Sequence, residues 1–272
     1  MPELPEVETI RQNLRRGGAN SPAILGWTIE SAHVLWARTL AVPDVDEFEK
    51  RLPGQQVIEI DRRGKFLVFE LSQDALLIHL RMSGDLMVEE GSEPRSTHCR
   101  MAIEFTNGQR LVFIDARKFG RVWLTAERDL ILSGLGPEPL DETFRSQDLY
   151  HRLHAHRRRL KPLLLDQAFL AGLGNIYADE ALHLARLHPL MLSNQVSAVQ
   201  AERLWWAIRT VIEEGIRRNG ASIDWVYRGG DFQNYFRVYQ RTGQPCRECG
   251  EVIQRIVVGQ RSAHFCPNCQ QL

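Results

Sequence analysis

The sequence predicts an α+β protein in which a β-rich N-terminal half is followed by a hinge, a helical segment and a zinc-binding hairpin. Three observations lead to this prediction. Apolar residues alternate with a period of two in several runs between residues 57 and 115, whereas a helical period begins near residue 197. A Gly- and Pro-rich stretch at residues 133–145 lies between these regions, and two Cys-x-x-Cys pairs close the chain.

The first predicted element is a short amphipathic helix after Pro5. Val7, Ile10 and Leu14 recur at helical spacing, and Gly17-Gly18 ends the pattern. The residues that follow favour strands up to about position 125, so we expect one helix at the start of a β-rich region.

Antiparallel strands are predicted next. Asn107-Gly108 between two apolar runs is a strong signal for a two-residue hairpin turn. Alternating or β-branched residues mark the other strands. The predicted strands are residues 57–60, 66–71, 75–80, 101–106 and 110–115.

The C-terminal half predicts helices and then a hairpin. Ser197-x-x-Gln200 has the pattern of a capping box and begins a long helix, and Gly220 lies just past its end. Its apolar face consists of Leu204, Ile208, Val211, Ile212 and Gly215. The β-branched runs 252–253 and 256–258 predict a β-hairpin near the end of the chain.

Cys246, Cys249, Cys266 and Cys269 have the spacing of a structural zinc site, with sixteen residues between the inner two. Four thiolates close a tetrahedral shell and leave no position for water, so one zinc ion would stabilise the fold without doing chemistry. Two disulfides are the alternative. The sequence shows no signal peptide or membrane-spanning run, so we expect a reducing compartment and therefore zinc. Cys99 is expected to be a buried small hydrophobe.

Charge is distributed unevenly along a chain whose formal net charge is zero. The segment 151–161 contains no acidic residue and five cations: Arg152, Arg157, Arg158, Arg159 and Lys161. Such a local basic stripe fits phosphate binding at one face of a neutral protein. A solvated helix face is the alternative interpretation.

The chain start offers a nucleophile. If the initiator methionine is removed, Pro2 carries a secondary α-amine, and an α-amino pKa of about 7.7–8.0 leaves far more of it neutral at pH 7 than of a lysine. Such an amine can attack an electrophilic sugar carbon to give a permanently cationic iminium. Pro at position 2 is common, so this pattern alone does not establish the chemistry. A retained Met1 would block the amine.

Six strings, in order between residue 2 and residue 270, resemble the formamidopyrimidine-DNA glycosylases of the bacterial Fpg/Nei family. They are PELPEVE at 2–8, RGKF at 63–66, HLRMSG at 79–84, DARKFG at 115–120, GLGNIYADE at 172–180 and RSAHFCPNCQ at 261–270. Leu4 and the string at 115–120 favour the purine-repair branch over the endonuclease VIII branch.

The resemblance implies a fold and a division of the chain. We expect an N-terminal antiparallel β-sandwich with an N-terminal helix, a helical domain with a helix–two-turn–helix motif, and a zinc-finger β-hairpin. The expected segments are a catalytic domain at 1–132, a hinge at 133–148, the helical domain at 149–236 and the zinc finger at 237–272.

The resemblance also implies a bifunctional DNA repair enzyme with one structural zinc and damaged double-stranded DNA as its partner. It would excise 8-oxoguanine and formamidopyrimidines through a Schiff base on Pro2 and then nick the strand by β,δ-elimination. We expect a monomer in the bacterial cytoplasm, associated with the nucleoid. The alternatives are an endonuclease VIII-like glycosylase for oxidised pyrimidines and a catalytically silent zinc-dependent protein that binds damaged DNA.

The resemblance assigns roles to individual residues. The expected catalytic residues are Pro2, Glu3, Lys65 and Arg261. The expected DNA-binding residues are His79, Met82, Arg117, Phe119 and Asn175. Of these, His79, Asn175 and Arg261 match phosphate-binding positions. Met82, Arg117 and Phe119 match residues that fill the void left by the extruded nucleotide.

Without the resemblance, four of these assignments have simpler interpretations. Glu3 would be a first-turn helix residue, Lys65 a surface lysine, and both Met82 and Phe119 core residues. Residues 220–236 correspond to the family's mobile loop over the extruded base. Their sequence departs most from the family pattern, so base preference is the weakest part of the prediction.

Overall fold

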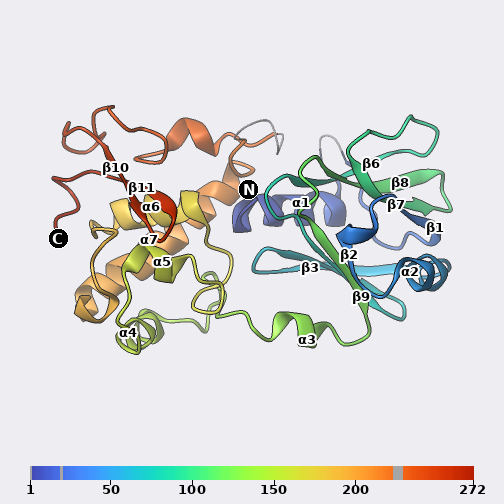
Figure 1. The fold of residues 1–272 in the computed structure, drawn as a ribbon, viewed down its shortest axis with the longest axis horizontal. Coiled ribbons are helices and arrows are strands. Elements are labelled where there is room, and N and C mark those ends of the chain that lie inside the picture. The colour runs from blue at the N-terminus through green and yellow to red at the C-terminus, as the bar shows by residue number, and fades with distance from the viewer. Residues whose placement is uncertain (1, 19–20, 223–228) are drawn as a thin grey trace. The chain divides into compact units, whose positions relative to one another are not determined.

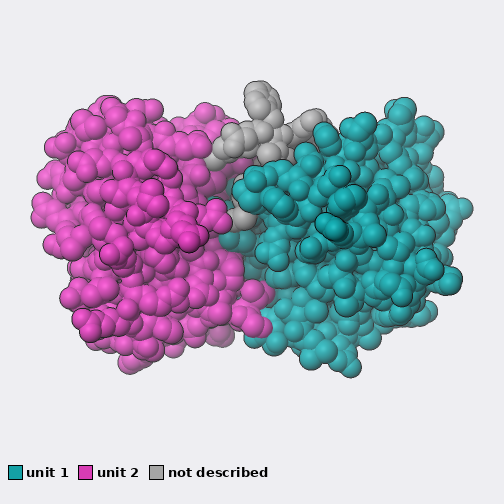
Figure 2. Space-filling model, viewed as in Figure 1, with its two compact units in different colours: residues 1–133, 222–229 teal, residues 134–221, 230–272 magenta. Residues whose placement is uncertain are grey.

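The computed structural model describes residues 2–18, 21–222 and 229–272 (Figure 1). The predicted α+β class is confirmed. The chain forms two compact units, unit 1 with residues 1–133 and 222–229, and unit 2 with residues 134–221 and 230–272 (Figure 2). Among the described residues, no helix is both long and apolar enough to cross a membrane.

Unit 1 begins with the predicted helix, α1 (Leu4–Arg16). Its apolar face is buried as expected, with Val7, Ile10 and Leu14 at most 5% exposed. The helix ends at Gly17, whose φ of +79° is a conformation that glycine adopts without steric cost.

Two sheets form the rest of unit 1, as predicted for a β-sandwich. Five strands lie in the order β2-β9-β5-β4-β3 and four in the order β1-β7-β8-β6, and only β2–β9 pair in parallel among these described strands. The strands are β1 (Ile29–Val34), β2 (Leu40–Val42), β3 (Val57–Arg63), β4 (Phe66–Leu71), β5 (Ala75–His79), β6 (Gly84–Glu90), β7 (Cys99–Phe105), β8 (Gln109–Asp115) and β9 (Arg121–Thr125). Phe69 and Leu76 of one sheet share a core with Phe105 and Phe113 of the other.

The expectation of a single helix in the β-rich region is wrong. A second helix, α2 (Val45–Arg51), follows Asp44, whose carboxylate accepts the backbone N–H of Glu47 at 2.9 Å. A third, α3 (Arg128–Leu132), ends the unit. Phe48 is the one buried side chain of α2, so this short helix has no apolar period that the sequence could display.

Unit 2 is helical and ends in a hairpin. The long predicted helix is α7 (Ala198–Arg217), and its capping box is formed because Ser197 and Gln200 exchange side-chain-to-backbone hydrogen bonds. The other helices are α4 (Ser146–His154), α5 (Leu160–Leu164) and α6 (Asn175–Leu184), with short 3₁₀ turns at Ala37–Thr39 in unit 1 and at Ser193–Gln195 and Phe232–Tyr235 in unit 2.

The hairpin differs in part from the prediction. It pairs β10 (Gln254–Val258) with β11 (Arg261–Phe265), so the run 256–258 is a strand as expected. The run 252–253 is not, because Val252 forms only an isolated bridge with Pro245. Gln260 and Gly259 both have positive φ and make the two-residue turn between the strands.

Gly84 should not tolerate a side chain, because its backbone approaches the preceding turn. A Cβ there would lie 2.5 Å from the carbonyl oxygen of Leu80 and 2.8 Å from the ring of Phe113. We expect Gly84→Ala to lower the free energy of unfolding by about 1–3 kcal/mol, measured by urea denaturation. Gly134→Ala is the control, because its Cβ would meet nothing within 4 Å. Equal stabilities of the two variants would contradict this steric account.

Candidate active site and zinc centre

The N-terminal residues of unit 1 are held at the start of α1. Pro2 is buried, and Glu3 is the N-cap residue with 2% of its surface exposed. The backbone N–H of Glu3 donates to Glu6 Oε2 at 2.8 Å, and Glu6 is equally buried. Two carboxyl groups are therefore fixed beside Pro2. Glu6 was not predicted as a site residue, although it lies within the string at 2–8.

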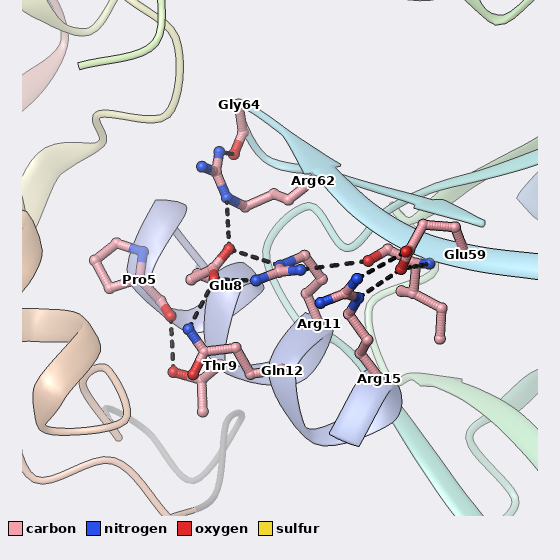
Figure 3. Close-up of polar contacts among 10 residues, drawn as sticks. Pro5, Glu8, Thr9, Arg11, Gln12, Arg15, Glu59, Arg62 and Gly64 are labelled. Carbon is pink, nitrogen blue, oxygen red and sulfur yellow. Dashed lines mark hydrogen bonds and ion pairs between the residues drawn. The ribbon is translucent and has the colours of Figure 1, made fainter. Parts of the chain in front are cut away.

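A chain of ion pairs ties this helix to the turn that carries Lys65 (Figure 3). Glu8 pairs with Arg11 at 2.7 Å and with Arg62 at 3.2 Å, and Arg62 Nη1 donates to the carbonyl oxygen of Gly64 at 2.9 Å. Burial acts to raise the pKa of Glu8, but hydrogen bonds from Arg11 and Gln12 with the charges of Arg11 and Arg62 lower it overall. Glu8 is therefore ionised, and the turn before Lys65 is fixed relative to α1.

Lys65 and His79 lie at the same end of the five-stranded sheet. Lys65 is 6% exposed and directly precedes Phe66, which pairs with His79 across β4 and β5. The simpler interpretation of Lys65 as a surface lysine is therefore wrong. The buried charge of Lys65 also acts on His79 and contributes to the shift of its pKa.

His79 is a neutral hydrogen-bond donor in this environment. Burial, assisted by the charges of Arg81 and Lys65, lowers the pKa of His79 to about 3. The backbone N–H of Arg81 donates to His79 Nδ1 at 3.0 Å, so the ring proton resides on Nε2. A neutral imidazole with a fixed Nε2–H can donate to a phosphate oxygen at any pH near neutrality.

The loop between β8 and β9 is shaped by one buried carboxylate. Asp115 is fully buried and accepts the hydroxyl of Ser83, the backbone N–H of Arg117 at 3.2 Å and the backbone N–H of Gly120 at 2.7 Å. Lys118 has a φ of +61°, and this turn projects the loop from the sheet. Asp115 and Ser83 were not predicted as site residues, although both lie within the family strings.

The side chains carried by this loop face solvent. Phe119 is 50% exposed, and the guanidinium of Arg117 lies 5.1 Å from the centre of its ring. Met82, in the neighbouring turn, is half-buried. The simpler interpretation of Phe119 as a core residue is therefore wrong. An exposed aromatic ring next to an arginine has the chemistry of a wedge that stacks on bases.

The basic stripe of residues 151–161 is not one solvent-facing surface. Lys161 is fully buried and pairs with Asp179, and Arg158 pairs with Asp166 at 2.7 Å. Arg152 donates to the carbonyl oxygen of Phe169 at 2.9 Å. These three cations are committed to contacts within unit 2, so the interpretation as a phosphate-binding stripe is wrong for Lys161. Arg157 and Arg159 are exposed whereas Lys161 is buried, a difference that could not be predicted from the sequence pattern.

Asp179 of α6 connects that helix to the zinc hairpin. It is 1% exposed, receives the ammonium of Lys161, and accepts both the backbone N–H of His264 at 3.1 Å and its ring Nδ1 at 3.0 Å. His264 lies on β11, the strand that begins with the exposed Arg261. The carboxylate therefore fixes the strand on which Arg261 is displayed. Asp179 was not predicted as a site residue.

Asn175 is the first residue of α6, and Gly174 before it is the N-cap residue of the helix. Lys161 Nζ donates to its carbonyl oxygen at 3.1 Å, which fixes the backbone of this helix start. Its side-chain Oδ1 is buried and has no hydrogen-bond partner among the described residues. The start of α6 has backbone N–H groups that can bind an anion such as a phosphate.

The four zinc-pattern cysteines converge as predicted. Their sulfur atoms all lie within 4.8 Å of one another, with 3.4 Å between Cys249 and Cys266 and 3.9 Å between Cys246 and Cys269. A tetrahedral zinc with bonds of about 2.3 Å requires S–S edges of about 3.8 Å. None of the four is in a disulfide, and Cys99 is buried elsewhere. The residues therefore fit one structural zinc ion.

Part of the expected mobile loop at 220–236 lies outside the described residues, namely 223–228. In the described part, residues 232–235 form a 3₁₀ turn and Phe232 is fully buried. Its ring stacks on Tyr177 of α6 at 5.1 Å between centroids. The C-terminal end of this segment is therefore packed against the helical unit.

Comparison with known families matches three successive parts of the chain. Residues 1–122 match the formamidopyrimidine-DNA glycosylase N-terminal domain, and residues 135–226 match the H2TH domain of the same enzymes. Residues 243–272 match the zinc finger found in FPG and IleRS. The predicted helix–two-turn–helix motif and zinc finger are thereby confirmed.

Full-length relatives are also similar. The chain is 41% identical over 280 residues to the formamidopyrimidine-DNA glycosylase of Protochlamydia amoebophila, with all of both chains covered. It is 44% identical to that of Chloroflexus aurantiacus, with 99% of this chain and 98% of the relative covered. The fold is similar to that of Lactococcus lactis Fpg bound to DNA containing N7-benzyl-Fapy-dG, with a TM-score of 0.92, 36% identity and full coverage of both chains. MutM in complex with DNA containing carbocyclic 8-oxo-G gives the same values.

His79 should make the stability of the protein depend on pH. An unfolded histidine takes up a proton below about pH 6.5, whereas folded His79 stays neutral down to about pH 3, so the folded state loses stability as the pH falls through this window. Between pH 7 and pH 5 the loss attributable to His79 is about 2 kcal/mol. We expect the free energy of unfolding, measured with urea, to fall less between pH 7 and pH 5 in His79→Gln than in the wild type. The two falls should differ by about 2 kcal/mol. The exposed His98 supplies the control, His98→Gln. The same pH dependence in all three proteins would refute the assignment.

Proposed function

The chain belongs to the formamidopyrimidine-DNA glycosylase family, and on this premise we propose that Pro2, once Met1 is removed, is the nucleophile of the reaction. The protein is a DNA repair glycosylase that acts on oxidised purines, has AP lyase activity and carries one structural zinc. The observation that carries the proposal for Pro2 is its buried position at the start of α1, next to two buried carboxyl groups.

The amine of Pro2 attacks C1′ of the damaged nucleotide, the C1′–N bond to the base breaks, and an iminium forms on the opened sugar. Glu3 is the group that moves protons at the sugar during ring opening and base departure. The permanent positive charge of the iminium acidifies the neighbouring C2′ proton, so loss of the 3′ phosphate and then of the 5′ phosphate follows by β- and δ-elimination. Glu6 holds the backbone of Glu3 in register for these steps.

Lys65 and His79 bind the phosphate groups that flank the damaged nucleotide. Lys65 supplies a positive charge, and the ion pairs from Glu8 through Arg62 fix the turn before it. His79 supplies a neutral Nε2–H donor. Such contacts fix the register of the DNA without reading its sequence.

Met82, Arg117 and Phe119 occupy the space that the extruded nucleotide leaves in the duplex. C1′ is out of reach inside the stack, and unstacking costs a few kcal/mol. The exposed ring of Phe119 with the guanidinium of Arg117 beside it offsets part of this cost by stacking on the neighbouring bases.

In unit 2, Asn175 and Arg261 bind phosphate groups of the same DNA. The proposal is supported by the position of Asn175 at the start of α6 and by the exposure of Arg261 at the start of β11. Arg261 would approach the reacting nucleotide as a catalytic residue through its charge. Asp179 fixes β11 and thereby positions Arg261.

We also propose the functional division of the chain and its cellular setting. Residues 1–132 form the catalytic domain, 133–148 the hinge, 149–236 the helical domain and 237–272 the zinc finger. The gaps between the matched family ranges, at 123–134 and 227–242, support the first and the last of these three boundaries. Because its substrate is chromosomal DNA, the enzyme acts in the bacterial cytoplasm at the nucleoid. It acts as a monomer.

Borohydride trapping tests the nucleophile. On a duplex with one 8-oxoguanine opposite cytosine, the wild-type protein should form a covalent adduct, and intact mass on the same sample should show that Met1 is absent. Pro2→Gly should lose most base excision and retain lesion binding, because glycine supplies a primary amine in a different backbone geometry. Unchanged turnover of Pro2→Gly would refute the mechanism. No adduct from a correctly processed wild-type chain would favour a protein that only binds damage.

Truncation of the wedge tests the role of Phe119. Phe119→Ala should lower kcat/KM for 8-oxoguanine excision by about 10-fold, equivalent to ~1.4 kcal/mol, because the vacated stack is no longer filled. Its thermal stability should not change, since the ring is half exposed. Ile58→Ala is the matched control, an equally exposed apolar side chain of unit 1 on β3. Equal activity of the two variants would exclude a wedge role.

A further inference from the structure

His183 lies against one of the zinc-binding cysteines. It is on the last turn of α6 and is 3% exposed, and its Nε2 is 3.5 Å from the sulfur of Cys246. Cys246 is itself 4% exposed, so this contact is shielded from water. A polar ring nitrogen at this distance from a buried thiolate either donates a hydrogen bond to it or repels it.

The surroundings of the ring decide between these two cases. His183 Nδ1 is buried and has no hydrogen-bond partner among the described residues. A proton placed on Nδ1 alone would leave an orphaned buried donor and would turn the lone pair of Nε2 toward the thiolate. A proton on Nε2 gives the thiolate a donor and leaves only an unsatisfied acceptor. We propose that His183 donates a hydrogen bond from Nε2 to the Cys246 thiolate and is a positioning residue that strengthens zinc binding.

The zinc centre needs such donors because it carries excess negative charge. Four thiolates around Zn²⁺ leave a net charge of about −2 in a partly buried site. Hydrogen bonds to the sulfur atoms disperse this charge and orient the ligands, and such outer contacts typically change metal affinity 10–100-fold. Cys266 receives a backbone donor, the N–H of Cys269 at 3.4 Å. For Cys246, the side chain of His183 serves this purpose.

The same helix also holds the other side of the zinc unit. Asp179 lies one turn before His183 on α6 and fixes β11 through His264. Glu180, next to it, accepts the backbone N–H groups of residues 237–239 at 2.8–2.9 Å. Helix α6 therefore holds the segments that carry the zinc ligands, and its His183 lies within hydrogen-bond distance of a zinc-binding sulfur.

The test compares zinc-loaded His183→Phe and His183→Gln with the wild type. Phenylalanine keeps the ring and removes the donor, whereas glutamine keeps an N–H donor. His188→Phe is the control, because His188 is also a buried histidine of unit 2, packs on Phe265 of β11 and has its Nδ1 hydrogen-bonded to the backbone N–H of Leu190 rather than to a cysteine. The measurements are zinc transfer to a chromophoric chelator and the sulfur-to-metal charge-transfer band after cobalt substitution.

We expect His183→Phe to bind zinc about 10-fold more weakly and to shift the cobalt band to longer wavelength, because its thiolate electrons are less stabilised. His183→Gln should recover part of both effects, and His188→Phe should match the wild type. Wild-type values for His183→Phe would overturn the proposal. So would equal zinc loss in His183→Phe and His188→Phe without a band shift, since that result would indicate a packing role alone.

A measurement on the wild-type zinc protein makes the test independent of how the variants fold. Long-range ¹H–¹⁵N NMR of the imidazole reports which ring nitrogen carries the proton. A proton on Nε2 is expected. A neutral ring with its proton on Nδ1 would overturn the proposal whatever the variants show.

Discussion

The architecture of unit 2 depends on two adjacent buried carboxylates, Asp179 and Glu180 of α6. Asp179 accepts hydrogen bonds from the ammonium group of Lys161 and from two donors of His264. Glu180 accepts hydrogen bonds from three successive backbone N–H groups and forms an ion pair with the guanidinium of Arg237. Burial raises the pKa of Glu180, while these donors oppose the rise. Buried charges are costly unless every partner is present, so such clusters permit only one arrangement of the segments that supply the donors.

This constraint connects the metal site to Arg261, the residue of β11 that is proposed to bind a DNA phosphate. The hydrophobic cluster at the zinc-pattern cysteines is small and contains Val238, Ile253, Cys246, Cys266 and Cys269. The metal and the hydrogen bonds from α6 therefore contribute to the position of the zinc hairpin. Gln270 adds a further connection, because its side chain accepts the backbone N–H of Cys266 and donates to the carbonyl oxygen of Leu187. These contacts fix β11 and therefore also the backbone of Arg261, which lies at the exposed end of that strand.

In unit 1, buried or half-buried carboxylates likewise fix the backbone segments that carry the predicted site residues. Asp115 shapes the loop that displays Arg117 and Phe119, and the Glu8–Arg62 pair links α1 to the turn before Lys65. In both cases a buried or half-buried ion fixes backbone groups, and the neighbouring side chains are those proposed to contact the DNA. A wedge or a nucleophile must be held within a fraction of an ångström, and directional hydrogen bonds provide that better than apolar contacts do.

Much of the fold and of the site follows from local patterns. The amphipathic period of α1, the Ser197–Gln200 capping box and the cysteine spacing each depend on neighbours within one element, and each is found as predicted. The predicted hairpin at Asn107-Gly108 is present, but its turn differs from the prediction. The register that pairs Glu104 with Arg110 leaves three residues, 106–108, between the strands, and of the two predicted turn residues only Gly108 has a positive φ. Helix α2 and strand residues such as 84–90 and 121–125 were missed because their periodicity is short or interrupted by charge. The buried partners Glu6, Asp115 and Asp179 were also missed as site residues, because nothing local distinguishes a buried carboxylate from a solvated one.

By itself, therefore, the sequence determined the family through its resemblance to known strings, and the α+β class and the metal ligands through periodicity and spacing along the chain. Only the tertiary structure decided which charges are buried. It excluded Lys161 from the basic stripe by placing it inside unit 2, and it turned Phe119 outward and set His183 against Cys246. The reason is that burial and the direction of a side chain are set by segments remote in sequence, and those contacts exist only once the chain has folded.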